Sequence, residues 1–214
     1  LRAARGLVER GLAPRALVDV ASATAVSRPG GADRYLSAAF AQVYRAARPR
    51  RLLLPGCGTG TGLEHVDPGV PERVVGVDLN LQYLAVARQR HERLGARLEL
   101  FCLDARTADL SESGFDLVHA ALLAEYLDPQ ALAAVMARAV APGGTCGVVL
   151  RLPGGEPAEE ASPAESVQGL AAATRLVEPA DLAALFAGRG LRRAGAWDVA
   201  SRGGRRLRVA IFRR

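Results

Sequence analysis

The sequence contains no lysine and little of several other residue types. All 28 basic residues among the 214 are arginine, and Asn80 and Ile211 are the only asparagine and isoleucine. This usage is typical of a GC-rich genome, which explains the arginines before any function does. The net charge of +6 could attract nucleic acid or acidic substrates. However, the arginines are mixed with acidic residues until the closing stretch RGGRRLRVAIFRR, so we do not expect nucleic acid as a partner.

Cysteine and histidine are scarce and dispersed along the chain. The three cysteines form no CxxC pair and the histidines show no metal-ligand spacing. The residues concerned are Cys57, Cys102, Cys146, His65, His91 and His119. Unpaired, scattered cysteines indicate buried free thiols in a reducing compartment. We therefore expect a cytoplasmic protein with no metal site.

Long apolar runs are also absent. No run approaches the 18 residues of a transmembrane helix, and the opening LRAARGLVERG lacks the apolar block of a signal peptide. Half of the residues are nevertheless hydrophobic, which is enough for a sizeable globular core. The sequence thus predicts one globular domain with no membrane association, and its oligomeric state stays open.

Apolar patterning predicts strands and helices in alternation. Helical spacing covers residues 33–47, 81–95, 129–144 and 178–190. Short apolar strands are expected at 50–56, 73–80, 97–104, 115–122 and 145–153, and residues 191–214 read as two strands around Arg-Gly-Gly. This order predicts an α/β fold: a doubly wound, mainly parallel seven-stranded sheet with helices on both faces. A C-terminal antiparallel hairpin and N-terminal helices complete it.

The stretch LLLPGCGTGTG places four alternating glycines at the end of the first predicted strand. Ligands of such sheets bind at the carboxyl ends of the strands. Glycine lets the backbone turn sharply and lets a ligand approach closely. We expect a helix to follow these glycines and to offer its free N–H groups to an anionic group.

Two acidic residues strengthen the prediction of a nucleoside site. Asp78 ends the second strand, where a carboxylate can accept hydrogen bonds from both hydroxyls of a ribose. Asp104 ends the third strand. The dinucleotide fingerprint Gly-x-Gly-x-x-Gly fails, because its last position falls on Thr61 or Leu63. The ligand is therefore expected to be a nucleoside other than a dinucleotide.

At this point the sequence resembles the class I S-adenosylmethionine-dependent methyltransferases. The motifs PGCGTG, VVGVDLNLQYLAVAR, CLDA, FDLVHAALLAEYL and RAVAPGG occur in the family's order, from about Arg51 onward. The resemblance implies S-adenosylmethionine as cofactor and S-adenosylhomocysteine as product. It also implies a methyltransferase domain at 49–214, preceded by a helical segment or lid at 1–48.

The resemblance implies a cofactor site at the strand ends. Asp78 would hold the ribose, the residue after it would pack on adenine, and Asp104 would meet the adenine edge. The implied residues are Gly56, Cys57, Gly58, Thr59, Gly60, Asp78, Leu79, Asp104, Ala105 and His119. One position departs from the family: Leu54 stands where an acid usually helps to hold the methionine amine. Either Glu64 takes over this role, or the cofactor binds more weakly.

Methyl transfer needs a positioned nucleophile and, for a protonated one, a base. The predicted catalytic residues near the methyl group are His119, Glu125 and Tyr126, with Glu64 and His65 across the loop. Each has another interpretation. His119 suits a strand end with a satisfied ring, Glu125 and Tyr126 suit solvent-facing positions, and His65 suits a structural role.

The leading interpretation is methyl transfer to an oxygen or nitrogen of a small molecule. The N-terminal helices would then cover the strand ends, with Tyr35 and Phe40 either lining the pocket or lying in the core. No Asp/Asn-Pro-Pro-Tyr motif follows the fourth strand, which disfavours methylation of nucleic-acid bases by that route. Two alternatives stay open. One is an RNA- or protein-modifying enzyme that uses the Arg-rich end (Arg205, Arg206, Arg213, Arg214), and the other is a non-catalytic nucleoside-binding module.

Overall fold

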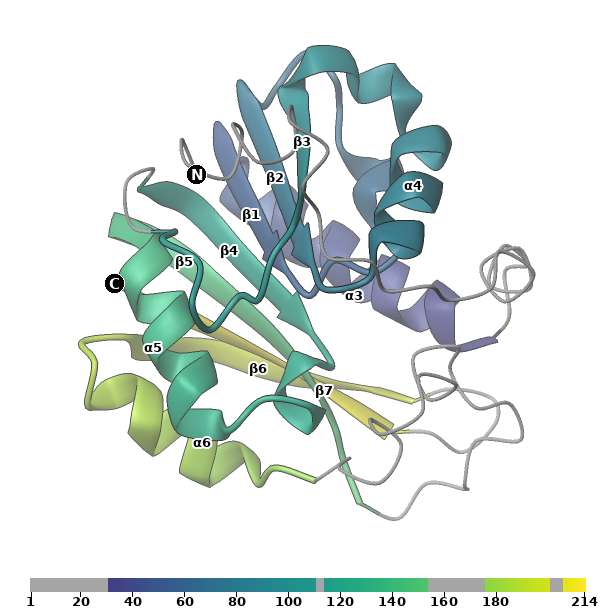
Figure 1. Ribbon diagram of the computed structural model, residues 1–214. Coiled ribbons are helices and arrows are strands. Elements are labelled where there is room, and N and C mark those ends of the chain that lie inside the picture. Colours follow the sequence, from purple (N-terminus) through teal and green to yellow (C-terminus); the bar gives the residue numbers. More distant parts are fainter. Residues whose placement is uncertain (1–30, 111–113, 154–175, 201–205) are drawn as a thin grey trace.

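A computed structural model describes residues 31–110, 114–153, 176–200 and 206–214. Their centre is a seven-stranded sheet of order β3-β2-β1-β4-β5-β7-β6 (Figure 1). The strands are β1 (Arg51–Pro55), β2 (Arg73–Asp78), β3 (Leu98–Cys102), β4 (Phe115–Ala121), β5 (Val140–Arg151), β6 (Arg192–Ala200) and β7 (Arg206–Arg213). The helices are α3 (Gly31–Ala47), α4 (Leu81–Arg90), α5 (Pro129–Ala139) and α6 (Pro179–Ala187), with 3₁₀ turns η1 (Leu63–His65), η2 (Glu92–Arg97) and η4 (Leu123–Glu125).

The strand directions confirm the predicted sheet. β1 to β5 are parallel, and β7 runs antiparallel to both β5 and β6. Several boundaries differ from the predicted ones, and the helix predicted over 81–95 ends at Arg90. The helix predicted over 129–144 ends at Ala139, because Val140 already pairs with Phe115 and begins β5. The register between β4 and β5 shifts between Phe115 and Leu117, where β5 contains the Pro-Gly-Gly sequence.

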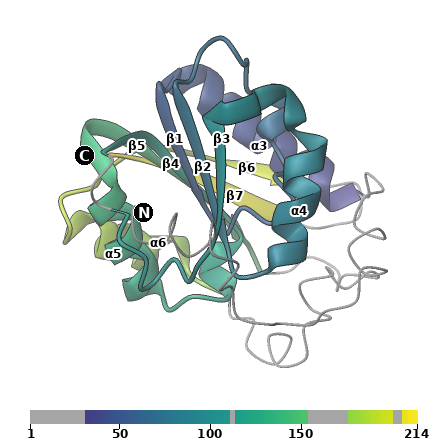
Figure 2. The ribbon, with the colours of Figure 1, turned by 45° about the horizontal axis from the view of Figure 1, so that its top comes forward.

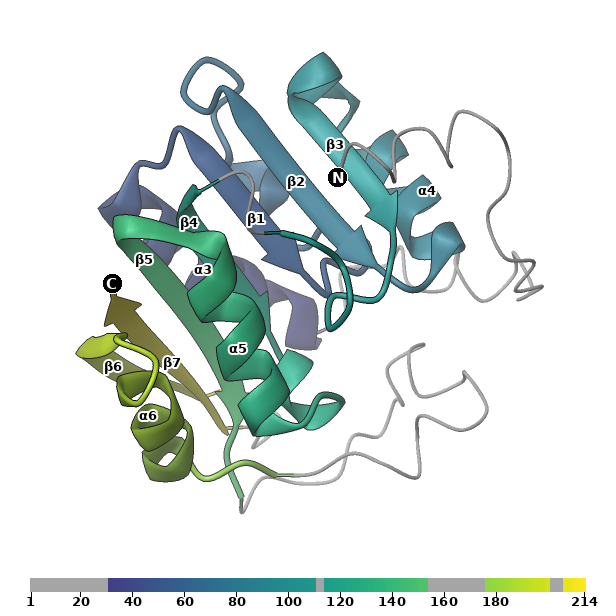
Figure 3. The same cartoon turned by 60° about the vertical axis from the view of Figure 1, so that its left-hand side comes forward.

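Helices cover both faces of the sheet (Figures 2 and 3). α5 and α6 pack on one face, where Phe186 of α6 meets Phe212 of β7 with ring centroids 4.4 Å apart. α3 and α4 lie on the other face. Within the described ranges, no helix is both long and apolar enough to cross a membrane.

α3 packs flat against the sheet. Phe40 and Val43 are buried with strand residues such as Leu117 and Val149, and Phe40 stacks on Tyr44 at 5.7 Å. Phe40 is therefore a core residue and does not line a pocket. The proposed division at residue 48 stays a prediction, since residues 1–30 lie outside the described part of the chain.

The prediction of a helix directly after the glycines was wrong. The chain forms only the three-residue turn η1, whose N-cap is Gly62 in the left-handed conformation. The sequence Asp67-Pro68-Gly69 then makes a turn, in which the Asp67 carboxylate accepts from the Gly69 amide at 2.8 Å. The residue before a proline avoids the helical region, so no longer helix can form here. No extended helix dipole therefore faces the site from this segment.

Candidate functional site

The glycine loop (residues 56–62) folds back over the end of β2. The amides of Gly56 and Cys57 donate to the carbonyl oxygen of Val77 at 2.8 and 3.1 Å. Gly58 and Gly62 have φ angles of 51° and 101°, in the left-handed region that favours glycine. A Cβ at Gly58 would point into open space, whereas one at Gly62 would meet the ring of Phe40 at 2.6 Å. Gly58 thus leaves room for a ligand, and Gly62 leaves room for the core.

Asp78 ties this loop to the second strand. Its Oδ2 accepts from the Gly58 amide at 2.8 Å and its Oδ1 from the Asn80 amide at 2.9 Å. The N-cap of α4 is Asn80, whose side chain accepts from the amides of Gln82 and Tyr83. Asp78 therefore does not cap the helix. Its oxygens keep acceptor capacity for further donors, because each has two lone pairs.

Burial changes the ionisation of groups around Asp78. It raises the pKa of Asp78 above its usual range, although the amides of Asn80, Gly58 and Leu79 act in the opposite direction. Burial, reinforced by the charges of Asp78 and Tyr126, also raises the pKa of Tyr83 to about 12. Asp78 and Tyr126, which follows η4, therefore lie close enough to influence the ionisation of Tyr83 in the first turn of α4.

Leu79 extends past β2 with 61% of its surface exposed. Its carbonyl oxygen accepts from the Cys102 thiol at 3.3 Å, which links the ends of β2 and β3. An exposed leucine beside a carboxylate can pack against the flat face of a base while the carboxylate binds the ribose of the same nucleoside. This placement is compatible with the role that the sequence predicted for Leu79.

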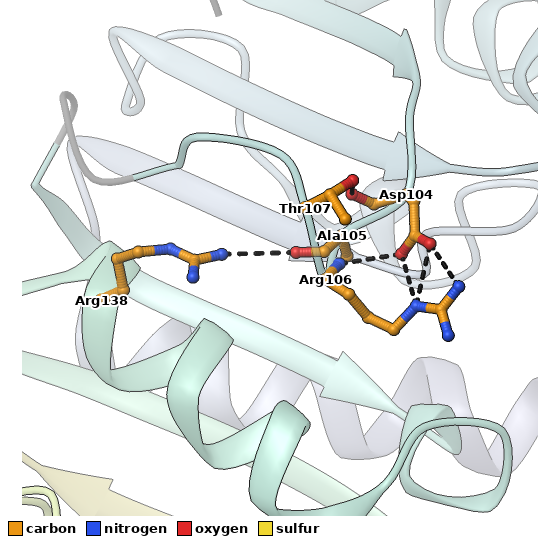
Figure 4. A network of polar contacts seen from close by, with 5 residues as sticks. All are labelled: Asp104, Ala105, Arg106, Thr107 and Arg138. Carbon is orange, nitrogen blue, oxygen red and sulfur yellow. Dashed lines mark hydrogen bonds and ion pairs between the residues drawn. The ribbon is translucent and has the colours of Figure 1, made fainter.

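Asp104 lies past the end of β3 and already has a partner (Figure 4). Its carboxylate accepts from the Arg106 backbone amide at 2.9 Å and from the Arg106 guanidinium at 2.8 and 3.0 Å. These contacts, above all the side-chain hydrogen bond from Arg106, lower the pKa of Asp104. Arg138 of α5 secures the same loop by donating to the carbonyl oxygen of Ala108 at 3.1 Å. Ala105 is buried within this loop.

Sequence reasoning missed Arg106. The signal was present, because a basic residue two positions after an acid can fold back onto it in a turn. Adenine would have to share the Asp104 carboxylate with this guanidinium.

Glu64 and His65 join the glycine loop to α3. The Glu64 carboxylate accepts from the Ser37 hydroxyl and, at 2.8 Å, from the Gly62 amide. Burial acts to raise the pKa of Glu64, but these hydrogen bonds outweigh it and lower the pKa. The Ser37 hydroxyl also lies 2.8 Å from Nε2 of His65. Glu64 thus has structural partners of its own, and Leu54 is buried in the core.

His119 lies inside the protein rather than past the end of β4. It is 3% exposed and meets the ring of Phe40 edge-on, with centroids 5.2 Å apart. It pairs with Gly147 of β5, where a Cβ would come within 2.7 Å of Nδ1. Burial lowers the pKa of His119 to about 4. Neither ring nitrogen has a hydrogen-bond partner among the described residues. This environment keeps the imidazole neutral and away from the strand ends.

Glu125 and Tyr126 follow β4 in and after η4. The Glu125 side chain is only 4% exposed and forms an ion pair with Arg151, at 2.8 Å between Oε2 and Nη2. Glu125 is therefore not the solvent-facing residue that the sequence allowed. Tyr126 is partly exposed. Of the three predicted catalytic residues, it alone keeps an accessible side chain.

Comparison with known proteins finds one family model that matches part of the chain. Residues 53–144 match the family model described as a methyltransferase domain. The matched segment includes the glycine loop, Asp78, Asp104 and the whole of α5. This segment, which is less than half of the chain, is similar to methyltransferase domains. The resemblance predicted from the sequence is thereby confirmed.

One curated relative is a phosphatidylethanolamine N-methyltransferase of Cereibacter sphaeroides. It is 35% identical over 106 residues, which are 48% of this chain and 51% of the relative. The chain therefore spans about half the length of that protein. The relative supports the family and leaves the activity of the whole protein to be proposed.

Solved structures confirm the fold. The N-methyltransferase NodS from Bradyrhizobium japonicum, in complex with S-adenosylhomocysteine, has a TM-score of 0.65 at 17% identity, over 87% of this chain and 88% of that chain. The [4+2]-cyclase SpnF has a TM-score of 0.65 at 19% identity, over 85% and 80%. Since one fold carries both names, the reaction has to be argued from the site.

Proposed function

We propose that this protein binds S-adenosylmethionine and transfers its methyl group to the nitrogen of a small-molecule amine. The single observation that carries the proposal is the Asp78 carboxylate, held by the Gly58 and Asn80 amides at the mouth of the glycine loop. The names of two relatives favour nitrogen over oxygen, because both are N-methyltransferases. The cofactor, substrate and reaction of this chain are all part of the proposal.

The residues present suit the cofactor. Gly58 leaves open space above the loop, Asp78 offers carboxylate oxygens for a ribose diol, and Leu79 exposes an apolar face for the base. We call the ends of β1, β2 and β3 the cofactor half of the site. With the base at β3 and the ribose at β2, the methionine part extends over β1 toward β4. The ends of β4 and β5 form the acceptor half.

The cofactor supplies a sulfonium-bound methyl group that an amine lone pair displaces in line. The protein's part is to align the amine and to exclude water. Tyr126 is the best placed of the predicted catalytic residues to orient an amine, because its side chain is partly exposed after β4. His119 and Glu125 are buried and are assigned structural or positioning roles.

The arginines at the C-terminal end support a small-molecule substrate over RNA. Arg208 donates to Asp198 at 2.6 and 2.9 Å, and Arg206 lies 3.7 Å from the same carboxylate. Arg214 donates to the carbonyl oxygens of Ala137 and Val140, each at 2.7 Å. These side chains serve contacts within the fold. Of the two other residues of the predicted basic end, Arg213 is exposed at the end of β7 and Arg205 lies outside the described residues.

Calorimetry and a methyl-transfer assay test the proposal together. The folded protein should bind S-adenosylhomocysteine in preference to NAD, and it should label a small amine from a methyl donor carrying labelled carbon. Binding without labelling of any small amine, RNA or protein would favour the nucleoside-binding module. Preference for NAD would refute the cofactor assignment.

A further inference from the structure

A buried ion pair lies in the acceptor half of the site. Glu125 of η4 is almost inaccessible, and its Oε2 is 2.8 Å from Nη2 of Arg151, the last residue of β5. The Arg151 side chain keeps 34% of its surface exposed. The neighbouring Ala124 is fully buried, so the carboxylate is surrounded largely by protein. One member of the pair thus faces inward and the other reaches the surface.

Stability alone gives a weak reason for this pair. Removing a carboxylate from water costs several kcal/mol, and an apolar pair of similar size is often at least as stable. What the buried Glu125 provides is a fixed position for the guanidinium of Arg151. η4 is itself attached to β5, because the Leu122 amide donates to the carbonyl oxygen of Val149 at 2.9 Å. Arg151 is therefore fixed by its own strand, β5, and by Glu125 of η4, which follows β4.

The position of Arg151 matters because β5 is parallel to β4, and β4 to β1. Their carboxyl ends meet at the edge that holds the glycine loop and Asp78 (Figure 3). If the methionine part extends from β1 toward β4, as in the proposed function, the amine approaches over β4 and β5. Arg151 would then border the acceptor rather than the cofactor.

We propose that Arg151, positioned by Glu125, binds an anionic group of the amine substrate, either a phosphate or a carboxylate. A guanidinium has five N–H donors in a fork that matches both groups. The contact with Glu125 uses Nη2 and leaves donors on the exposed part of the side chain. The substrate class is thus an amine that carries a nearby negative charge. This inference rests on the proposed function only for the place of the amine.

Binding of three small amines tests the inference. O-phosphoethanolamine, glycine and ethanolamine share a primary amine and differ in the anionic group. With the protein saturated by S-adenosylhomocysteine, the anionic amines should bind at least tenfold more tightly than ethanolamine. Arg151→Gln should abolish that preference, and Arg151→Lys should keep part of it. Vesicles containing phosphatidylethanolamine distinguish a lipid headgroup from a free phosphate, since only a headgroup site would bind them through Arg151.

Arg208→Gln is the control, because Arg208 of β7 forms an ion pair with Asp198 of β6, on strands that lie farther from the glycine loop than β5 does. It should leave the preference intact. Glu125→Gln should raise KM for the anionic amine several-fold while kcat is kept, which a purely structural residue would not do selectively. Unchanged affinity for S-adenosylhomocysteine shows that each variant is folded.

Inorganic phosphate gives a readout that needs no cofactor. The unliganded protein should bind it more tightly than the Arg151→Gln variant. Equal binding of phosphate and of the three amines by parent and Arg151→Gln would overturn the inference. If the parent protein does not bind S-adenosylhomocysteine, the proposed function is refuted. The phosphate measurement then still tests whether Arg151 binds an anionic group.

Discussion

The cofactor half and the acceptor half lie side by side at one edge of the sheet but are built differently. In the cofactor half, the contacts are made by backbone amides close to a turn: Asp78 binds the amides of Gly58 and Asn80. In the acceptor half, the contact joins side chains from separate elements, Glu125 of η4 and Arg151 of β5. Backbone contacts depend on local geometry, whereas side-chain pairs depend on how the whole sheet is assembled.

This difference explains where sequence reasoning succeeded. The position of Asp78 at the end of β2 was correct, and so was the position of the glycines after β1. In the acceptor half, His119 was expected past the end of β4 and lies in the core. Four experiments can break or sharpen the contrast.

The largest effect is expected at Gly62. An alanine there would adopt a strained φ of 101° and place its Cβ 2.6 Å from the ring of Phe40. We expect Gly62→Ala to lower the free energy of unfolding by about 4 kcal/mol, from strain and overpacking together. Chemical denaturation measures this loss.

Gly58→Ala is its matched comparison. Its Cβ meets no atom within 4 Å, so the stability loss should be about 1 kcal/mol. Affinity for S-adenosylhomocysteine should fall roughly tenfold, because the Cβ points into the space proposed for the ligand. Similar stability losses for the two alanines would contradict the division between a core glycine and a ligand glycine.

The next effect is expected at Asp78. Two charge-assisted hydrogen bonds to a ribose are together worth about 3 kcal/mol, so Asp78→Ala should weaken S-adenosylhomocysteine binding roughly a hundredfold. Calorimetry on the folded variant measures the change. Asn80→Ala is the control, because it removes the cap of α4 and should cost about 1 kcal/mol of stability with little change in affinity. An affinity of Asp78→Ala within about threefold of the parent would disprove the ribose contact.

A smaller effect concerns pH and His119. Its pKa of about 4 in the folded protein lies below the ordinary value of 6.5, so the unfolded chain binds a proton first as the pH falls. Stability should be full above about pH 7, decline down to about pH 4 and then level off. Between pH 7 and pH 5 the free energy of unfolding should fall by about 2 kcal/mol because of His119.

His119→Leu should flatten this decline in denaturation curves recorded from pH 7 to pH 5. His91, whose pKa is also lowered by burial, adds a decline in the same direction, and the variant should keep that part. A variant profile as steep as that of the parent would show that His119 does not titrate in this way.

The smallest effect is expected at Arg106. Its ion pair with Asp104 is exposed and contributes little to the free energy of unfolding, because water screens it. If adenine competes with Arg106 for the Asp104 carboxylate, Arg106→Ala should strengthen S-adenosylhomocysteine binding about threefold. Arg138→Ala is the comparison, since it loosens the same loop without freeing the carboxylate. Weaker binding by Arg106→Ala would mean that the arginine itself contacts the cofactor.

The sequence alone determined the sheet and the backbone part of the site. Apolar runs of strand length, alternating with helical patterns, fix which segments form a parallel sheet, and Gly and Pro mark where each segment ends. The glycines follow β1 and Asp78 ends β2, the next strand along the chain, which pairs directly with β1. Their arrangement depends on φ angles and on bonds between residues a few positions away from a strand end, which a sequence pattern can reveal.

Only the tertiary structure decided the environments of the side chains. Arg151 is 26 residues from Glu125, and His119 meets both Phe40, which precedes β1, and Gly147, which lies on β5. A period of two places such residues on one face of a strand, but it does not say whether that face is covered. The cover is α3 for His119, since the ring of Phe40 on α3 meets the imidazole edge-on. Burial is a property of the packed neighbours, so the neutral imidazole and the buried carboxylate arise only when distant segments meet.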